Sequence, residues 1–243
     1  MSSALSMNIK CSGRKSGVRR PSVIAIVPAA GYGNRLGAGK KKPLVFLRKK
    51  PIVSYALKAL NDCPLVDAII VASEKALVKD FWGLTGKYGF KKIIDVVVGG
   101  KTRQESVSNC IKAISSSYDI VLIHDAARPL IDRTTIKKSI DLAKKFGACI
   151  VAVPENDTIK LADKGLFVKK TLDRKKIFRA QTPQAFRYDI IKKAYRVFKR
   201  PGKYTDDAGL VEKLGVKIKI FEGPRRNIKI TTKEDLKLAE VLL

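Results

Sequence analysis

The segment 28–44, PAAGYGNRLGAGKKKPL, combines glycines with cationic side chains. Gly31 and Gly33 allow a sharp turn that brings backbone N–H groups close to an anion. The spacing matches neither the Walker A motif nor the dinucleotide motif GxGxxG, because Leu36 stands at the place of the third glycine. The pattern favours a triphosphate site, and a glycine-rich turn with solvated lysines is the alternative. The positive charge of the segment comes from Arg35, Lys40, Lys41 and Lys42.

A second polar group, HDAARP at 124–129, offers a carboxylate, a guanidinium and the only histidine of the chain. Asp125 follows an apolar run and is placed to hold a Mg²⁺ ion that bridges phosphates. Arg128 could pair with Asp125 or with a ligand. His124 has no accompanying signature of a nucleophilic Ser or Cys, so we interpret it as a hydrogen-bonded structural residue. A hydrolase is therefore disfavoured.

The elements that position these groups alternate between apolar runs and helical patterns. The runs at 22–27, 67–72, 93–98, 119–123 and 148–153 are typical of strands buried on both faces, and 51–61 has helical spacing. This order predicts a doubly wound, mostly parallel α/β sheet. The glycine-rich segment, GGKTRQES (99–106) and HDAARP follow the first, third and fourth strands. Because ligands bind beyond the carboxyl ends of such strands, the three loops are expected to converge.

The pattern changes after Val153. Residues 154–183 are polar and rich in turns, which predicts a protruding β-arm. We then expect helices at 188–199 and 206–214, strands at 216–221 and 227–230, and a final helix from about Thr232. The expected organisation is a disordered basic tail, 1–21, followed by a single domain, 22–243, that contains the arm.

Composition limits the class of protein. The net charge of +28 and the pI near 10.1 permit nucleic-acid binding. No RNA-binding, zinc-finger or basic-zipper pattern accompanies the charge, so we favour lysines on solvated helix faces and expect no specific nucleic-acid partner. The four cysteines form no CxxC pair, which indicates a reducing compartment. No apolar run approaches the roughly 20 residues of a membrane span.

The Ser-rich, basic segment 1–21 has the composition of a transit peptide or of a plain tail. We expect a cytoplasmic protein with no membrane partner, and a plastid is the alternative.

Seven motifs occur along the chain in the following order: VPAAGYGNRLG, GGKTRQESV, LIHDAARPLI, DTIK, LDR followed by AQTPQAF, TDDAGLVE and EGPRRNIKITTKEDLKLAE. In this combination the chain closely resembles the methylerythritol phosphate cytidylyltransferase family of the non-mevalonate isoprenoid pathway. The resemblance covers about residues 22–243. It implies a Rossmann-like nucleotidyltransferase that uses CTP, a sugar-alcohol phosphate and Mg²⁺ or another divalent cation. It also implies a homodimer in which the arm clasps the second subunit.

The resemblance assigns residue roles position by position. The implied catalytic residues are Arg35, Lys42, Arg174 and Lys229. The implied CTP contacts are Ala29, Ala30, Gly31, Gly100, Ser106, Asp125, Ala126 and Arg128. The implied contacts to the sugar phosphate are Thr158, Arg174, Thr205 and Lys229, and Asp125 is also the implied metal ligand.

Two positions depart from the family pattern. The family commonly has PKQ where this chain has KKP, and counting without gaps places Lys42 at the catalytic position, next to Lys40 and Lys41. An acidic residue is frequent where Lys101 stands.

The implied reaction transfers CMP from CTP to the sugar phosphate and releases pyrophosphate. The nucleophile would be a phosphate oxygen that is largely ionised at pH 7, so no general base is needed. Cations and a divalent metal would offset the charge that builds up at the transferred phosphorus.

Two alternatives remain at this stage. Ribitol phosphate cytidylyltransferases are similar, but they tend to have AGG in the loop after the first strand and Ser-Val before Arg-Pro in the loop after the fourth strand. A basic nucleic-acid-binding protein without catalysis is the other alternative. The joint retention of Arg35, Lys42, Asp125 and Lys229 argues against it.

Overall fold

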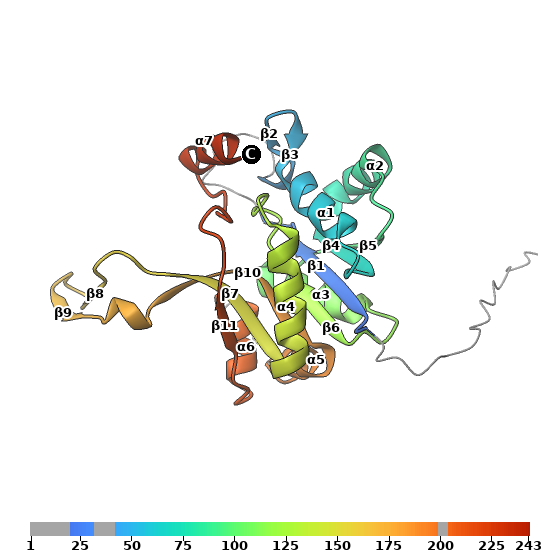
Figure 1. The fold of residues 1–243 in the computed structure, drawn as a ribbon. Coiled ribbons are helices and arrows are strands. Elements are labelled where there is room, and N and C mark those ends of the chain that lie inside the picture. Colours follow the sequence, from blue (N-terminus) through green and yellow to red (C-terminus); the bar gives the residue numbers. More distant parts are fainter. Residues whose placement is uncertain (1–19, 32–41, 199–203) are drawn as a thin grey trace, which may run out of the picture.

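A seven-stranded sheet forms the centre of the computed structural model, which describes residues 20–31, 42–198 and 204–243 (Figure 1). The strand order is β11-β7-β10-β6-β1-β4-β5. β10 runs antiparallel to its neighbours β6 and β7, and the remaining pairs are parallel. The predicted doubly wound, mostly parallel sheet is confirmed. The strands are β1 Val23–Pro28, β4 Ala68–Ser73, β5 Ile93–Val98, β6 Ile120–Ile123, β7 Ala148–Pro154, β10 Phe178–Arg187 and β11 Lys219–Glu222.

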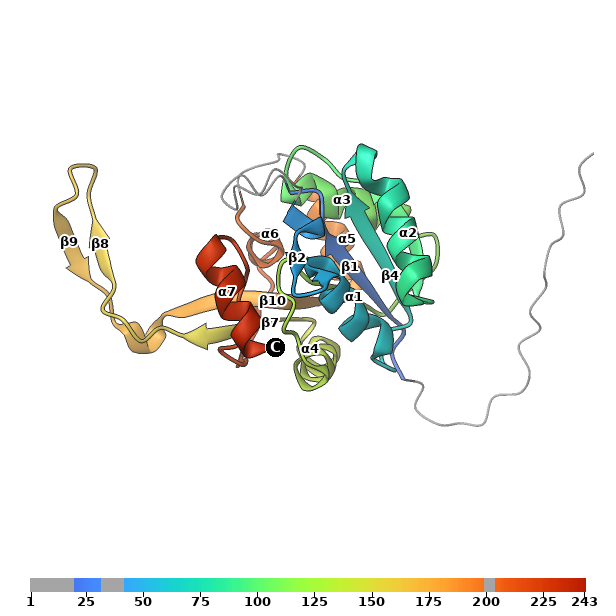
Figure 2. The same ribbon diagram turned by 90° about the horizontal axis from the view of Figure 1, so that it is seen from above.

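Helices cover both faces of this sheet (Figure 2). One face packs against α1 (Ile52–Asp62), α2 (Val78–Tyr88) and α4 (Arg133–Phe146), and the other against α3 (Arg103–Ala113), α5 (Tyr188–Val197) and α6 (Asp207–Glu212). Alternate residues of β1 enter the two cores, Ala25 on one side and Ile24 on the other. A strand buried in this way reads as an unbroken apolar run, which is why β1 could be predicted.

A smaller layer packs beside the main body. The hairpin of β2 (Phe46–Leu47) and β3 (Lys50–Pro51) shares a small core with α7 (Lys233–Leu242). The prediction of a strand at 227–230 is wrong. This segment instead lies over the loop after β6, where the N–H of Ile230 donates to the carbonyl of Ala127 at 2.9 Å. It therefore carries its side chains to the carboxyl edge of the sheet.

The predicted arm is a projecting hairpin, as both ribbon views show (Figures 1 and 2). It consists of β8 (Lys160–Ala162), β9 (Val168–Thr171) and the short helix η4 (Arg174–Lys176). The arm ends earlier than the predicted residue 183, because β10 begins at Phe178 and pairs with β7 in the main sheet. Leu166 and Phe167 at the tip are 86% and 75% exposed.

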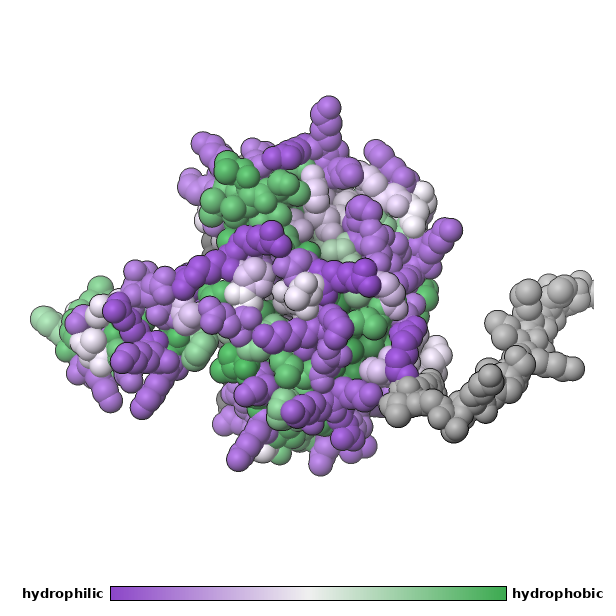
Figure 3. All heavy atoms as spheres, viewed as in Figure 1, coloured by the Kyte–Doolittle hydropathy of each residue, from purple (hydrophilic) through white to green (hydrophobic). Residues whose placement is uncertain are grey.

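The surface is strongly polar over most of the face drawn in Figure 3. Among the described residues, no helix is both long enough and apolar enough to cross a membrane.

Candidate active site

The loops after β1 and β5 touch at the carboxyl edge of the sheet, as the sequence predicted. A Cβ atom on Gly99 would lie 2.5 Å from Ala30 Cβ and 2.9 Å from the hydroxyl of Ser106. Backbone hydrogen bonds fix both loops to β4, from Ala29 to Ala72 and from Gly99 to Ser73, each at 2.7 Å. Only glycine fits at position 99 without displacing the first loop.

The start of α3 shapes the loop after β5, which we call the second loop. The Thr102 hydroxyl accepts from the backbone N–H of Glu105, and the Glu105 carboxylate accepts from the backbone N–H of Thr102; the two bonds form a capping box. The hydroxyl of Ser106 accepts from the N–H of Gly100 at 3.1 Å and donates to the carbonyl of Thr102 at 2.9 Å. Ser106 therefore holds the backbone of Gly100 in place.

Asp125, the second residue after β6, is the electrostatic centre of this edge. Its Oδ1 accepts from Arg103 Nε at 3.0 Å, and its Oδ2 lies 2.8 Å from Lys229 Nζ and 3.9 Å from Arg128 Nε. Burial alone would raise the pKa of this carboxyl group, but Arg103, Lys229 and Arg128 outweigh burial and hold the pKa well below its usual range. The carboxylate is ionised at neutral pH.

His124 supports this loop from the interior, and it is fully buried. Its Nε2 lies 3.0 Å from the carbonyl of Arg128 and its Nδ1 lies 3.0 Å from the hydroxyl of Thr182. Since a carbonyl only accepts, Nε2 carries the proton and Nδ1 accepts from Thr182, whose oxygen accepts in turn from the N–H of Asp125 at 3.0 Å.

Burial lowers the pKa of His124 to about 4, so the ring is neutral at pH 7. The interpretation of His124 as a structural residue agrees with these contacts.

Asn227 joins the same network from the far end of the chain. Its amide nitrogen donates to Gln181 Oε1 at 3.0 Å and to the carbonyl of Thr182 at 2.9 Å. Its carbonyl accepts from Arg128 Nη1 at 2.7 Å. The guanidinium of Arg128 is thus directed at protein oxygens, and burial lowers its pKa. Asn227 fixes the segment that presents Lys229.

The structure brings together only part of the predicted site. Asp125, Arg128 and Lys229 meet, Ala126 is buried in the same loop, and the loop that contains Gly100 approaches Ala30 at Gly99. Ser106 lies beside this point of approach and holds Gly100. Gly31 is exposed. Arg35 lies outside the described residues, as does the side chain of Lys42, whose backbone begins η2 (Lys42–Leu44).

The remaining predicted residues lie elsewhere in the chain. Thr158 and Arg174 are exposed on the arm, where Arg174 Nη1 donates to the carbonyl of Asn156 at 2.7 Å. Thr205 is exposed just before α6. Arg225 bonds the side chain of Asn156 at 2.9 Å, so the base of the arm is tied to the segment that leads to Lys229.

Sequence reasoning missed Arg103 and Asp207, although both lie in motifs that it singled out, GGKTRQES and TDDAGLVE. Both residues stand at the first position of a helix, and Arg103 Nη1 lies 2.7 Å from Asp207 Oδ2. A charged residue at a helix start beside a ligand loop was the available signal.

A doubly wound sheet with a glycine-rich first loop and a cation-bound carboxylate at the same edge is characteristic of a nucleotidyltransferase. The sequence profile of the family described as 2-C-methyl-D-erythritol 4-phosphate cytidylyltransferase matches residues 23–243. The chain belongs to this family, whose members transfer the cytidylyl group of CTP to 2-C-methyl-D-erythritol 4-phosphate in the non-mevalonate isoprenoid pathway.

Individual relatives agree with this assignment. The enzymes of that name from Clostridium acetobutylicum and Geotalea uraniireducens are 42% and 44% identical over 90% and 91% of this chain and 96% of each relative. The crystal structure of 4-diphosphocytidyl-2C-methyl-D-erythritol synthase from Anaerococcus prevotii superposes with a TM-score of 0.81 at 30% identity, covering 92% of this chain and 99% of that one.

Proposed function

We propose that cytidylyl transfer takes place at the loops around Asp125. One observation carries this proposal: an ionised carboxylate is bound on one oxygen by Arg103, whose side chain is 27% exposed, and on the other by Lys229, whose side chain is 39% exposed. Lys229 is a cation on a solvent-facing side chain, so its ammonium group can leave Asp125 for a phosphate oxygen. Arg128 is bound to backbone carbonyls and lacks that freedom.

The proposed nucleotide site uses the neighbouring loops. Backbone N–H groups of the first loop, at Ala29, Ala30 and Gly31, would face the triphosphate, while Gly100 and the loop that Ser106 holds would face the cytosine ring. Ala126 and Arg128 would line the rest of the proposed nucleotide site. The close approach at Gly99 supports this proposal, since it places the first and second loops side by side.

In the proposed reaction a phosphate oxygen of the acceptor attacks the α-phosphorus of CTP. A P–O bond to the acceptor forms, the P–O bond to the β-phosphate breaks, and pyrophosphate leaves with the electron pair. The attacking oxygen is already ionised, because the second pKa of a phosphate monoester is about 6. The protein therefore needs cations and not a base, and Arg35, Lys42, Lys229 and Arg174 are the proposed set.

A divalent cation fits this site through one protein ligand. No cluster of three or more metal-ligating side chains occurs among the residues that the structure describes. Mg²⁺ that arrives with a triphosphate needs only one or two carboxylates, since phosphates and water supply the remaining oxygens. Asp125 Oδ2, now bound by Lys229, would hold the ion, which would neutralise charge on the phosphates.

The arm suggests how the acceptor site is completed. Its tip exposes Leu166, Phe167 and Val168, an apolar surface that a second copy of the chain would cover. Thr158 and Arg174 are exposed on the same arm and have no contact with Asp125 within the described chain. We propose a two-fold homodimer in which each arm brings these residues to the site of its partner.

The residue roles are tested by pyrophosphate release from CTP and 2-C-methyl-D-erythritol 4-phosphate. Lys229→Met and Asp125→Asn should each lower kcat about a hundredfold, because each removes a charge placed at the reacting phosphates. Lys233→Met is the matched control, since Lys233 is an exposed lysine four positions further along the chain. A kcat for Lys229→Met that matches the control would refute the assignment.

The shared site is tested by subunit exchange between Lys229→Ala and Arg174→Ala homodimers, each expected to be nearly inactive. A heterodimer would have one site with both residues intact and one site lacking both. A random mixture is half heterodimer, so activity should reach about one quarter of that of the unmutated enzyme if sites act independently. If verified exchange restores nothing, Arg174 acts within its own chain.

A further inference from the structure

Arg103 occupies a position between two buried carboxylates. Its Nε contacts Asp125 Oδ1 at 3.0 Å and its Nη1 contacts Asp207 Oδ2 at 2.7 Å. The side chains of Asp125 and Asp207 are only 9% and 0% exposed. A planar guanidinium with donors on two sides can bridge two carboxylates in a fixed geometry, which a lysine ammonium cannot do.

Asp207 is itself held from the other side. Its Oδ1 accepts from the hydroxyl of Tyr195 at 2.6 Å, and its backbone N–H donates to Gln184 Oε1 at 3.1 Å. Burial, followed by the charge of Asp207, raises the pKa of Tyr195, so the phenol stays protonated and donates. Asp207 therefore has one orientation, and so does the guanidinium of Arg103 that binds it.

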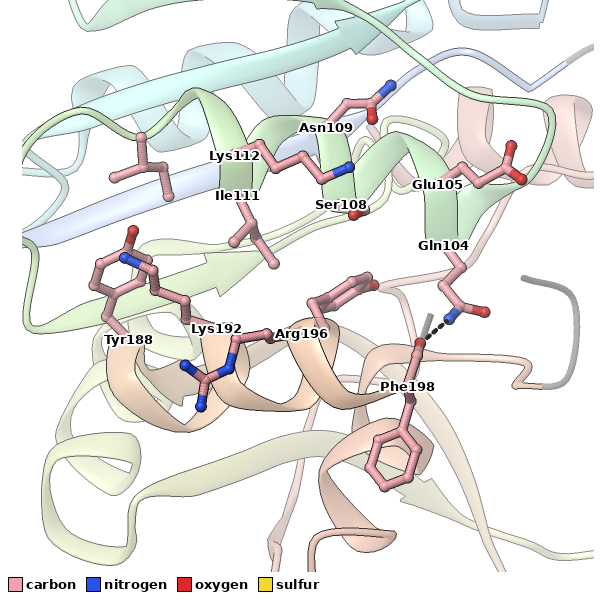
Figure 4. A pocket seen from close by; sticks show the side chains of 12 residues that line it. Gln104, Glu105, Ser108, Asn109, Ile111, Lys112, Tyr188, Lys192, Arg196 and Phe198 are labelled. Atoms are coloured by element: carbon pink, nitrogen blue, oxygen red, sulfur yellow. Dashed lines mark hydrogen bonds between the residues drawn. The ribbon is translucent and has the colours of Figure 1, made fainter. Parts of the chain in front are cut away.

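The polar chain connects the start of α3 with α5 and α6. A groove of about 590 Å³ lies between α3 and α5 (Figure 4). Near the start of α3 the two sides are joined by the Gln104 amide, which donates to the carbonyl of Phe198 at 3.4 Å, and by the chain from Arg103 through Asp207 to Tyr195. These polar links tie Arg103 and the start of α3 to α5 and α6, in addition to the apolar core that the three helices share.

We propose that Arg103 is a positioning residue for the transfer reaction. It orients the Asp125 carboxylate and leaves one carboxylate oxygen of Asp125 available for ligands. Arg103 occupies Oδ1, so Oδ2 is the oxygen that can exchange Lys229 for a cation carried by the nucleotide. The same guanidinium links the start of α3 to the start of α6, and Thr205 lies two residues before α6. The proposal rests on the proposed role of Asp125 at the reacting phosphates.

Arg103 could also serve only to neutralise the buried charge of Asp207. Removal of Arg103 alone would leave that charge uncompensated, which destabilises a protein whatever the role of the arginine. The informative variant is therefore Arg103→Gln combined with Asp207→Asn. It removes both charges, and the two amides can still hydrogen bond to each other.

The experiment measures kcat, the KM for CTP and the thermal unfolding midpoint of this double variant. We expect an unfolding midpoint within a few degrees of that of the unmutated protein. We expect kcat to fall about tenfold to a hundredfold, because displacement of a reacting-site group by about 1 Å has effects of that size. The KM for CTP should stay within about twofold. Lys112→Gln, which removes one charge near the other end of α3, is the control and should leave kcat unchanged.

A folded double variant with kcat within twofold of the unmutated enzyme would overturn the proposal, as would an equal loss in Lys112→Gln. If the double variant does not fold, Arg103→Lys decides by the same criterion, since it keeps the charge but loses the bridging geometry. Asp125→Asn is measured in parallel. Full activity of that variant would remove the proposed role of Asp125 itself, whereas an inactive Asp125→Asn beside a fully active double variant would overturn only the role of Arg103.

Discussion

Acidification should destabilise this protein through its single histidine. The His124 ring is fully buried and neutral in the folded chain, and its pKa falls from 6.5 to about 4. In the unfolded chain the same ring takes up a proton below pH 6.5. Between these two values the unfolded state binds the extra proton, so stability is complete above pH 6.5 and is lost as the pH falls toward 4.

The size of the effect follows from the two pKa values. Each pKa unit is worth about 1.4 kcal/mol, so the full difference is about 3 kcal/mol once both states are protonated. At pH 5 the unfolded ring is almost entirely protonated and the folded ring is not. We therefore expect a loss of about 2 kcal/mol in the free energy of unfolding between pH 7.5 and pH 5.

Urea denaturation at pH 7.5 and pH 5 measures this loss. His124→Gln is the comparison variant, because its amide keeps one donor and one acceptor but does not titrate. The variant should be less stable at pH 7.5 and should lack the 2 kcal/mol step. The chain has no other histidine, so no second group of this type can produce the step. An equal pH dependence in both proteins would refute the assignment of a neutral, buried ring.

Four further substitutions test the loops and the scaffold. Gly99→Ala should lower kcat/KM for CTP at least about tenfold in a steady-state assay, because its Cβ would meet Ala30 at 2.5 Å and displace the first loop; unchanged kinetics would show that the two loops do not form one site. Gly83→Ala, in the middle of α2 where a Cβ meets nothing within 4 Å, should raise the free energy of unfolding by about 0.5–1 kcal/mol without changing kcat; a loss of stability in the same urea titration would contradict this. Lys42→Ala should lower kcat by about two orders of magnitude and Lys41→Ala far less, and the reverse order would show that the catalytic lysine was assigned one position too late.

The strands of the parallel part of the sheet could be predicted because burial on both faces leaves an unbroken apolar run, as at 22–27 and 148–153. β10 could not, since Gln181, Thr182 and Gln184 interrupt its apolar pattern. Those polar groups are buried because Asn227, His124 and Asp206 satisfy them from distant parts of the chain. No local pattern reports such partners.

The same limit applies to the candidate site. The convergence of the three loops followed from their places after parallel strands. The close approach of Gly99 to Ala30 and the ion pair between Arg103 and Asp125 confirm it. Arg128 could be named as a partner of Asp125, but Arg103 and Lys229 could not, because a chain with this many cations offers no local reason to choose them. The segment 227–230 alternates like a strand, yet its hydrogen bonds to the loop after β6 decide its conformation.

The acceptor preference of the purified chain tests the central claim most directly. Pyrophosphate release should be measured with CTP, Mg²⁺ and either 2-C-methyl-D-erythritol 4-phosphate or ribitol 5-phosphate, each over a range of concentrations. The account predicts a kcat/KM for the methylerythritol phosphate at least about a hundredfold above that for ribitol phosphate, since a site that binds the correct acceptor phosphate and hydroxyl groups penalises a misplaced one by several kcal/mol. Equal or higher kcat/KM with ribitol 5-phosphate, or no release with either acceptor, would contradict it.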